Sequence, residues 1–436
     1  MQEWARLRAY ARRMRIVQGY DILDPLSLQV LSVLQSNAFK EPLLPNLQTL
    51  RMWITTRTEE LMPFVPLLLS TKTTLIDLTL SGYDVYKAEI ASMVTSLPTL
   101  CPNLNRIRFV GLPRDSMITD AVSELVLRIG RNDLQYFDAD SPLTAEAREV
   151  IYKHPNLSTL QAVFDGPTTL PTIALPNLTS IDIESCYGHD WLQGFCGASL
   201  GKLTSVSIFS DSDPTDEFLE AFKAVALTTS IPATLSKFSY STEHPWRPSY
   251  RSLLPFTQLT GLVIESTCEF ECSSTIDDDI ITDLARAMPR LELLHLGGSP
   301  CETPAGVTVK GLAALAYHCS HLFNLGIHFQ VASLDPAVIP SLTSKPNEST
   351  IPREYCPLHF LQAGRIRVPE ESVSKVASAL VQIFPHLKEI ESSDMRWREV
   401  SSIIHRCRQL ARVFAVFRSI TDHTSTVRRA HSLSTA

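Results

Sequence analysis

A five-residue motif in the sequence resembles a catalytic serine site. Residues 197–201 are Gly-Ala-Ser-Leu-Gly, which matches the Gly-x-Ser-x-Gly nucleophile elbow of acyl-transfer enzymes. In that elbow a strand precedes the serine and a helix follows it, so that the hydroxyl is exposed on a sharp turn. Here residues 203–208, which follow Ser199, have the alternating pattern of a strand. We therefore interpret the motif as a loop, predict that the chain is not an enzyme, and keep an enzyme that uses Ser199 as the alternative.

Residue types that bind metals or phosphate also occur in short clusters. Cys268 and Cys272 have no second pair of ligands at the spacing of a zinc site. His318, Cys319 and His321 lie where the chain enters a strand, and a turn there does not bring three side chains together on one ion. The three aspartates 277–279 precede a helical pattern, and carboxylates at a helix N-terminus are stabilised by the helix dipole. The Gly-Gly-Ser of 297–299 is too short for a phosphate loop. We predict no metal, no cofactor and no catalytic residue.

Composition excludes several classes of protein. The chain has 436 residues, of which 44% are apolar and 19% charged, so it holds ample apolar surface to fold. The net charge of −7 gives no basic footprint for nucleic acid. Its longest apolar runs, such as 64–69 and 411–417, are far shorter than the roughly 18 residues of a membrane helix. An odd number of cysteines, nine, at irregular spacing and without a visible signal peptide, predicts reduced thiols in the cytoplasm or nucleus.

The strongest pattern is a repeated phrase, Leu-x-x-Leu-x-Leu, often preceded by Pro-Asn. We number its first leucine position 1. Clear copies start at Leu47, Leu104, Leu157, Leu178, Leu259, Leu291 and Leu322, and weaker ones at Leu75, Leu134, Leu203, Leu235, Leu358 and Leu387. The steps between these 13 starts run from 21 to 36 residues, with a mean of about 28, which lies inside the range of leucine-rich repeats.

The phrase predicts a short strand, because positions 4 and 6 point to one side of an extended chain. One such strand cannot bury its apolar row alone, whereas stacked copies share a continuous core. Between the strands, apolar residues at helical spacing predict helices. These helices cover residues 58–69, 85–97, 116–129, 144–152, 307–319, 370–384 and 397–414, with further starts at Asp213 and Asp277. The fold class is therefore α/β: a curved leucine-rich-repeat solenoid of about 13 irregular repeats, with a parallel concave sheet and helices outside.

Several segments, taken in order, are similar to a known family. They are residues 4–15 with their Trp and arginines, the repeated Leu-Pro-Asn-Leu phrase, residues 254–262 (Leu-Pro-Phe-Thr-Gln-Leu-Thr-Gly-Leu) and the helix that ends before Cys319. Together they resemble the leucine-rich-repeat region of fungal F-box proteins, above all those of mushroom-forming fungi. In that family an F-box precedes the repeats and binds a Skp1-type adaptor in a ubiquitin ligase. No F-box opening of the type Leu-Pro-x-Glu is evident before Trp4, so the resemblance implies this adaptor only if an F-box exists upstream.

The resemblance gives an expected division of the chain. Residues 1–20 form a helical cap or linker, in which Trp4, Leu7, Ala11 and Met14 share one helical stripe; residues 21–415 form the repeat domain; and residues 416–436 form a disordered tail. The implied function is a protein–protein interaction module, the substrate-recognition part of an F-box-type SCF ubiquitin-ligase subunit. The alternative is a stand-alone repeat scaffold without a link to ubiquitin ligases.

The expected binding site follows from the strand geometry. Positions 3, 5 and 7 of each phrase point into the concave face, where an unidentified protein would bind. The candidate contact residues there are Arg51, Trp53, Arg106, Arg108, Tyr136, Asp138, Asp140, Asp182 and Glu184. A long insert adds the candidate loop contacts Trp246, Arg247 and Tyr250. Trp53 has an alternative role in packing between repeats. We expect replacement of Arg106 and Arg108 by glutamate to weaken binding without loss of stability.

Overall fold

The computed structural model describes residues 2–20, 42–55, 59–81, 86–129, 133–164, 174–185, 192, 195, 198, 200–211, 218–229, 231–244, 246, 248–266, 276–297, 306–337, 339, 356–364 and 366–410. The chain forms two compact units, Met1–His244 and Pro245–Ala436, which we call the N-terminal and C-terminal units. The predicted tail, 416–436, lies outside the described residues.

Short parallel strands alternate with helices along the chain. Fourteen strands form one sheet, in which each strand neighbours the next in sequence order. The strands are β1 (Ile16–Tyr20), β2 (Thr49–Ile54), β3 (Leu75–Leu80), β4 (Arg106–Val110), β5 (Tyr136–Pro142), β6 (Thr159–Phe164), β7 (Ser180–Ser185), β8 (Ser205–Ser210), β9 (Lys237–Thr242), β10 (Gly261–Ser266), β11 (Leu293–Leu296), β12 (Asn324–Ile327), β13 (Phe360–Gly364) and β14 (Glu389–Ser392). The predicted α/β class is confirmed, and the arrangement is consistent with a leucine-rich-repeat-like solenoid.

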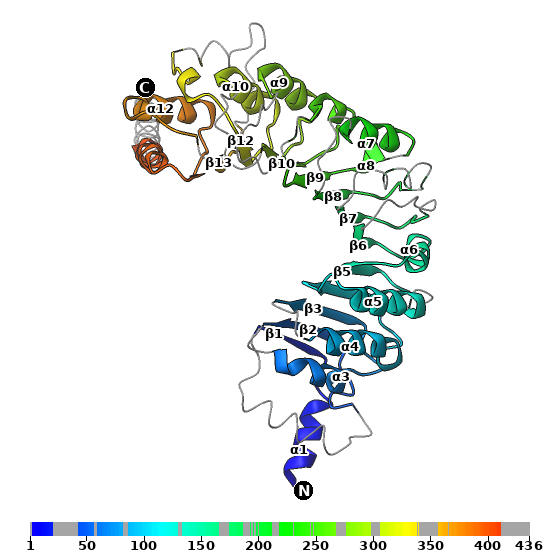
Figure 1. Ribbon diagram of the computed structural model, residues 1–436. Helices are drawn as coiled ribbons and strands as arrows, with labels where there is room; N and C mark the ends of the chain where they lie inside the picture. The colour runs from blue at the N-terminus through cyan, green and yellow to red at the C-terminus, as the bar shows by residue number, and fades with distance from the viewer. Residues whose placement is uncertain are drawn as a thin grey trace, which may run out of the picture. The chain divides into compact units, whose positions relative to one another are not determined.

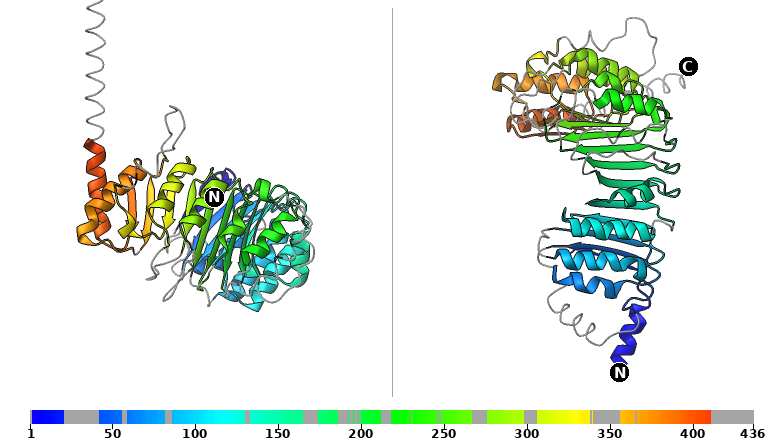
Figure 2. Two further views of the ribbon diagram at one scale, coloured as in Figure 1. Left: turned by 90° about the horizontal axis from the view of Figure 1, so that it is seen from above. Right: turned by 45° about the vertical axis from the view of Figure 1, so that its right-hand side comes forward.

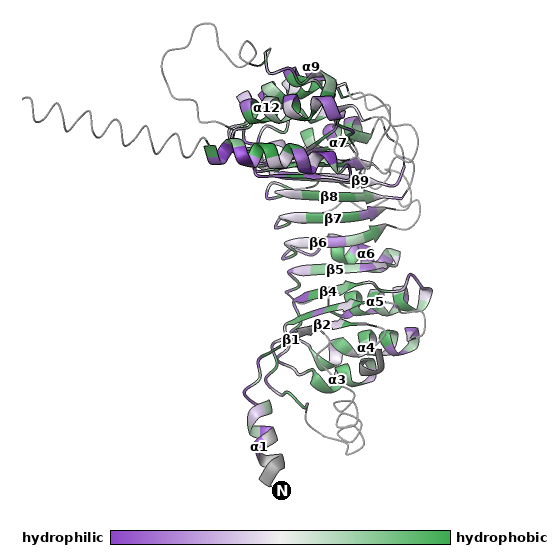
Figure 3. Cartoon of the chain, turned by 90° about the vertical axis from the view of Figure 1, so that its left-hand side faces the viewer, coloured by the Kyte–Doolittle hydropathy of each residue, from purple (hydrophilic) through white to green (hydrophobic). Residues whose placement is uncertain are grey.

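In the N-terminal unit the helices between the strands lie on one side of the sheet. Figure 1 shows α3 to α6 on the same side of β1 to β6, and Figure 2 shows them stacked beside one another. The helical elements of this unit are α1 (Gln2–Ala11), η1 (Glu59–Phe64), α3 (Val65–Leu68), α4 (Lys87–Leu100), α5 (Ser116–Ile129), α6 (Ala145–Tyr152), α7 (Phe218–Leu227) and α8 (Ile231–Thr234). In α5 the buried residues Ile118, Val122, Leu125 and Ile129 recur at spacings of three and four. Figure 3 accordingly colours α4 and α5 with both hydrophobic and hydrophilic residues.

The C-terminal unit repeats the same alternation. Its helical elements are η3 (Tyr250–Leu253), α9 (Asp278–Ala287), α10 (Val309–His318), η4 (Val331–Ser333), η5 (Glu370–Ser372), α12 (Val373–Ile383) and a helix over residues 396–410. Helices α9 and α10 pack side by side. Asp277 caps α9 by accepting from the amide of Ile280 at 2.8 Å. The interpretation of the aspartate run as a helix start is therefore confirmed.

The core is built from positions 1, 4 and 6 of the repeats. Leu47, Leu50 and Met52 are buried in the first copy of the phrase, and Leu104, Ile107 and Phe109 occupy the same positions two strands further along. Three cysteines before the phrase are buried as well, namely Cys101, Cys319 and Cys356. Burial raises the pKa of the Cys319 thiol to about 12, which keeps it protonated.

Hydrogen bonds between turns connect successive repeats. The asparagine before position 1 donates from Nδ2 to a turn of the preceding repeat: Asn46 to the carbonyl of Arg12 at 2.7 Å and Asn103 to that of Thr71 at 2.8 Å. The residue after position 1 forms a second series over β6 to β9, in which each hydroxyl donates to the carbonyl of the preceding repeat at 2.8–3.0 Å. This hydroxyl series consists of Ser158, Thr179, Thr204 and Ser236.

The structure corrects two details of the predicted repeats. Leu75 pairs with Thr49, which is at position 3, so position 1 of that repeat is Thr73 and the predicted start is two residues late. Residues 1–20 contain, besides α1, the strand β1, which pairs with β2. Helix α1 ends at Ala11, so that Met14 lies beyond it and is 44% exposed.

Candidate protein-binding surface

Positions 3, 5 and 7 of the N-terminal unit lie on the face of the sheet opposite the helices, which we call the open face. In β2 the pattern of exposure alternates, with Leu50, Met52 and Ile54 buried and Arg51 and Trp53 exposed between them. The parallel register places equal positions of successive repeats side by side, so that position 5 forms one continuous row across the sheet. This row consists of Gln18, Arg51, Asp77, Arg108, Asp138, Gln161, Asp182, Ser207 and Ser239.

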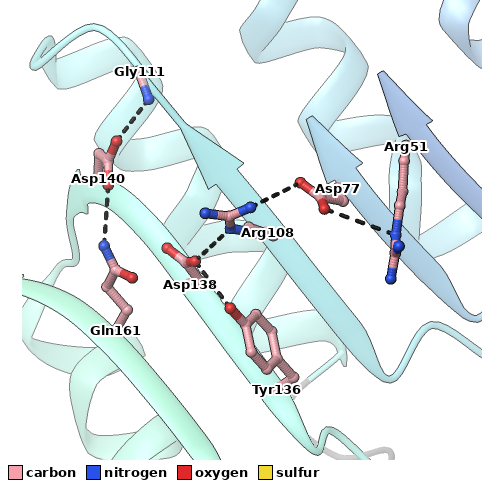
Figure 4. Close-up of polar contacts among 8 residues, drawn as sticks. All are labelled: Arg51, Asp77, Arg108, Gly111, Tyr136, Asp138, Asp140 and Gln161. Carbon is pink, nitrogen blue, oxygen red and sulfur yellow. Dashed lines mark hydrogen bonds and ion pairs between the residues drawn. The ribbon is translucent and has the colours of Figure 1, made fainter. Parts of the chain in front are cut away.

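Opposite charges alternate in the middle of the position-5 row (Figure 4). Asp77 lies between two arginines, with its carboxylate 3.9 Å from Nε of Arg51 and 3.7 Å from Nη1 of Arg108. Arg108 also donates from Nε to Oδ2 of Asp138 at 3.0 Å. The hydroxyl of Tyr136 donates to the same oxygen at 3.1 Å. The row therefore neutralises part of its own charge across four strands.

Asp138 is the buried member of this network, with only 1% of its surface exposed. Burial raises its pKa from 3.8 to about 6, although the hydrogen bonds from Arg108 and Tyr136 act in the opposite direction. Burial, followed by the charge of Asp138, raises the pKa of Tyr136 to about 12. For Arg108, burial lowers the pKa, but the hydrogen bond to Asp138 and the charge of Asp77 outweigh it, and the net shift is upward.

Gln161 continues the network on β6. Its amide nitrogen is best oriented toward Asp138, whose two carboxylate oxygens lie 3.1 and 3.2 Å away. In the opposite orientation, drawn in Figure 4, the nitrogen is 3.5 Å from Oδ1 of Asp140. Asp140 accepts from the amide of Gly111 at 2.6 Å. Gly111 has φ +77°, and a Cβ there would lie 2.0 Å from the carbonyl oxygen of Leu80, so only glycine fits this turn.

An ion pair spans the neighbouring strands beyond this network. Arg114, from the segment between β4 and α5, contacts the carboxylate of Glu184 on β7. Next to it, burial raises the pKa of Asp182, while a hydrogen bond with Ser207 lowers it. The acidic residues of the open face are thus already engaged by groups of the same unit.

Most of the predicted contact residues interact with other groups of the N-terminal unit. Arg51, Arg108, Tyr136 and Asp138 are brought together through Asp77, whereas Asp140, Asp182 and Glu184 contact other parts of the unit. Arg106, at position 3 of β4, is exposed, and its side chain has no hydrogen bond or ion pair within the described part of the chain. Trp53 is 44% exposed.

Two of the three predicted loop contacts, Trp246 and Tyr250, are buried and not exposed. Trp246 and Tyr250 are only 5% and 4% exposed, because both side chains pack into the interior of the C-terminal unit. We therefore do not include them in the binding surface. Arg247, like Ser199, Cys268 and Cys272, lies outside the described residues.

Sequence reasoning missed Asp77, Gln161 and Arg114. Asp77 was missed because the repeat start was placed at Leu75; counting from Thr73 puts it at position 5. Gln161 is at position 5 of its own repeat, so counting positions from Leu157 would have placed it on the open face. Arg114 lies outside the repeated phrase, and no sequence signal indicated its contact with Glu184.

In the described ranges, no three His, Cys, Asp or Glu side chains gather in a way that would hold a metal ion. Among the helices described, none has the length and apolarity needed to cross a bilayer. No family model matches the chain, and no curated protein does.

Proposed function

We propose that the chain is a protein-binding module whose interface is the open face of the N-terminal unit. The observation that carries the proposal is the exposure of Arg51, Trp53 and Arg106 on the face of the parallel sheet opposite the described helices. Strands fix the backbone positions of these side chains, so little backbone conformational entropy is lost when a partner binds. A face of this kind suits an extended contact with another macromolecule.

The composition of the surface supports a protein as the partner. Trp, Tyr and Arg are the side chains that most often dominate the binding energy of interfaces. Arg106 is unpaired among the described residues and loses no internal ion pair on binding, whereas Arg108 is already held by Asp77 and Asp138. We therefore propose Trp53, Arg51 and Arg106 as the main anchors, with the other residues of the position-5 row, from Asp77 onward, as their rigid support.

The resemblance to fungal F-box proteins extends this proposal. In that family the repeats receive the substrate of a ubiquitin ligase, so we propose the same role for this face, with a Skp1-type adaptor bound through an F-box encoded upstream. A stand-alone scaffold remains the alternative. Co-purification of the intact gene product with the adaptor supports the ligase role, and its absence from that preparation favours the scaffold.

The test of binding is an affinity pull-down with the full chain, followed by quantitative mass spectrometry. The double variant Trp53→Ala with Arg106→Glu should weaken the binding of specific partners about thirtyfold, since two anchors that each contribute about 1 kcal/mol together contribute about 2 kcal/mol. The control is Met117→Ala with Arg128→Glu, which changes exposed residues of α5 on the helix side. If both double variants retain the same partners, the interface is not on the open face.

A further inference from the structure

The N-terminal end of the chain carries an excess of positive charge. The described residues 2–20 and 42–55 contain six arginines and one glutamate, whereas the whole chain has a net charge of −7. Arg12, Arg13 and Arg15, at the entry to β1, are all exposed. Among the described residues, the side chains of Arg12 and Arg13 form no hydrogen bond or ion pair, and that of Arg15 has one long contact, 3.5 Å, with the carbonyl of Asn46. Such a cluster attracts a negatively charged partner.

The same arginines lead into an edge strand. β1 pairs with β2 and, within the described part of the chain, with no other strand. The backbone N–H and C=O groups on the outer edge of its five residues therefore have no strand partner there. An unpaired edge is a template on which an extended segment adds as a further strand, held by main-chain hydrogen bonds.

Apolar side chains lie between the arginines. Met14 and Ile16, on either side of Arg15, are 44% and 60% exposed. Large apolar side chains next to arginine are typical of the centres of protein interfaces. We call the set of Arg12, Arg13, Met14, Arg15, Ile16 and the outer edge of β1 the N-terminal edge surface.

We propose that the N-terminal edge surface binds an acidic, extended segment of a partner protein, which pairs with β1 as an additional strand. Its carboxylates meet Arg12, Arg13 and Arg15, and its apolar side chains cover Met14 and Ile16. A nucleic acid would supply the negative charge but neither the strand pairing nor the apolar contacts. Ile16, which pairs with Thr49 at position 3, lies on the open face, but the anchors Arg51, Trp53 and Arg106 are not part of this surface, and the inference does not depend on the function proposed above.

The test uses the full chain and a fluorescein-labelled peptide of about ten residues that alternates valine and glutamate, in the length range of a strand. Fluorescence anisotropy at neutral pH should show saturable binding that weakens between about 50 and 300 mM salt, because screening reduces exposed ion pairs. Hydrogen exchange should show new protection of the outward-facing amides of Ile16–Tyr20, which are every second amide of the strand. The triple variant Arg12→Glu, Arg13→Glu and Arg15→Glu should weaken binding about tenfold or more, as expected from three exposed ion pairs.

Two controls and a competition experiment decide the result. The variant Lys310→Glu, Lys375→Glu and Arg398→Glu makes the same change of charge at exposed helix positions of the C-terminal unit and should bind normally. A peptide of the same charge, with proline in place of valine, lacks the amides needed for pairing and should bind far more weakly. The proposal is overturned if either control matches its counterpart, if the peptide does not bind, or if single-stranded DNA displaces the peptide at lower concentration.

Discussion

Arg108 on β4 and Asp138 on β5 form a hydrogen-bonded ion pair of 3.0 Å on the open face, and the carboxylate is buried although the guanidinium is half exposed. Arg108 is therefore a structural residue as well as a surface residue. Arg108→Ala leaves a buried acceptor without its charged donor and should lower the free energy of unfolding by about 1–3 kcal/mol. Urea denaturation followed by circular dichroism measures this loss.

This finding revises the sequence-based expectation that Arg106 and Arg108 are both replaceable without loss of stability. The expectation should hold for Arg106 alone, whose exposed side chain makes no contact of this kind in the described residues. Arg106→Ala is thus the matched control, with an expected change within about 0.5 kcal/mol. Equal losses for the two variants would mean that the ion pair contributes nothing.

The raised pKa of Asp138 predicts a pH-dependent stability. In the unfolded chain the carboxyl titrates near 3.8, whereas in the folded chain its pKa is about 6. Between these values the folded state holds a proton that the unfolded state has lost, so this contribution to stability falls as the pH rises and is constant above the folded pKa. Asp138→Asn removes the effect and should gain up to about 3 kcal/mol relative to the parent between about pH 4 and 7.

The measurement for Asp138 is the urea midpoint of both proteins across that pH range. Other carboxyl groups titrate in both and cancel in the difference. The stability of Asp138→Asn minus that of the parent should rise with pH. If this difference is constant or falls as the pH rises, the predicted protonation of Asp138 in the folded chain is wrong.

Leu294 on β11 is at position 4 and is fully buried. Leu294→Ala should cost about 2–5 kcal/mol, because it removes apolar contacts and leaves a cavity. Leu293, the preceding residue, is only partly buried and points to the other side of the strand, so that Leu293→Ala should cost about 1 kcal/mol or less. Thermal or urea denaturation distinguishes the two, and a reversed order would mean that the strand register is wrong.

Asp278 connects two helices, so its replacement should lower the stability of the fold more than replacement of its neighbour Asp279. Its carboxylate accepts from the amide and hydroxyl of Thr308, at 2.7 and 2.5 Å, and from the amide of Gly311 at 2.9 Å, all at the start of α10. Asp278→Ala should therefore cost about 1–2 kcal/mol, the usual effect of losing a helix cap. Asp279→Ala, at an exposed position of the same run, should change stability by less than about 0.5 kcal/mol. The unfolding midpoints of the two variants provide the comparison.

The fold was predictable because the apolar positions repeat with a fixed relation to the strands. β4 begins two residues after Leu104, as β2 does after Leu47. The prediction failed where a polar residue takes the buried position: Thr73 replaces leucine because its hydroxyl can donate to the carbonyl of Leu47 at 3.0 Å. It missed β1 for a related reason, since Gly19 stands where later repeats have a large apolar residue at position 6.

The candidate site was only partly predictable. Position numbers place Arg108 and Asp138 on one face, but their pairing depends on the register between strands that are 30 residues apart in sequence. The burial of Trp246 and Tyr250 depends on how their segment packs, for which composition alone gives no signal. Exposure of aromatic residues in an insert is therefore the least reliable of the sequence-based inferences.

The hydroxyl series over β6 to β9 has a mechanical consequence. Thr179, Thr204 and Ser236 each connect one repeat to the one before it, and no hydrogen bond of this series skips a repeat. When the two ends of the chain are pulled apart, the hydrogen bonds between one pair of repeats therefore break before those between the next pair. Stretching a single molecule should release its length in successive steps, each of about one repeat, or roughly 90–100 Å of extended chain.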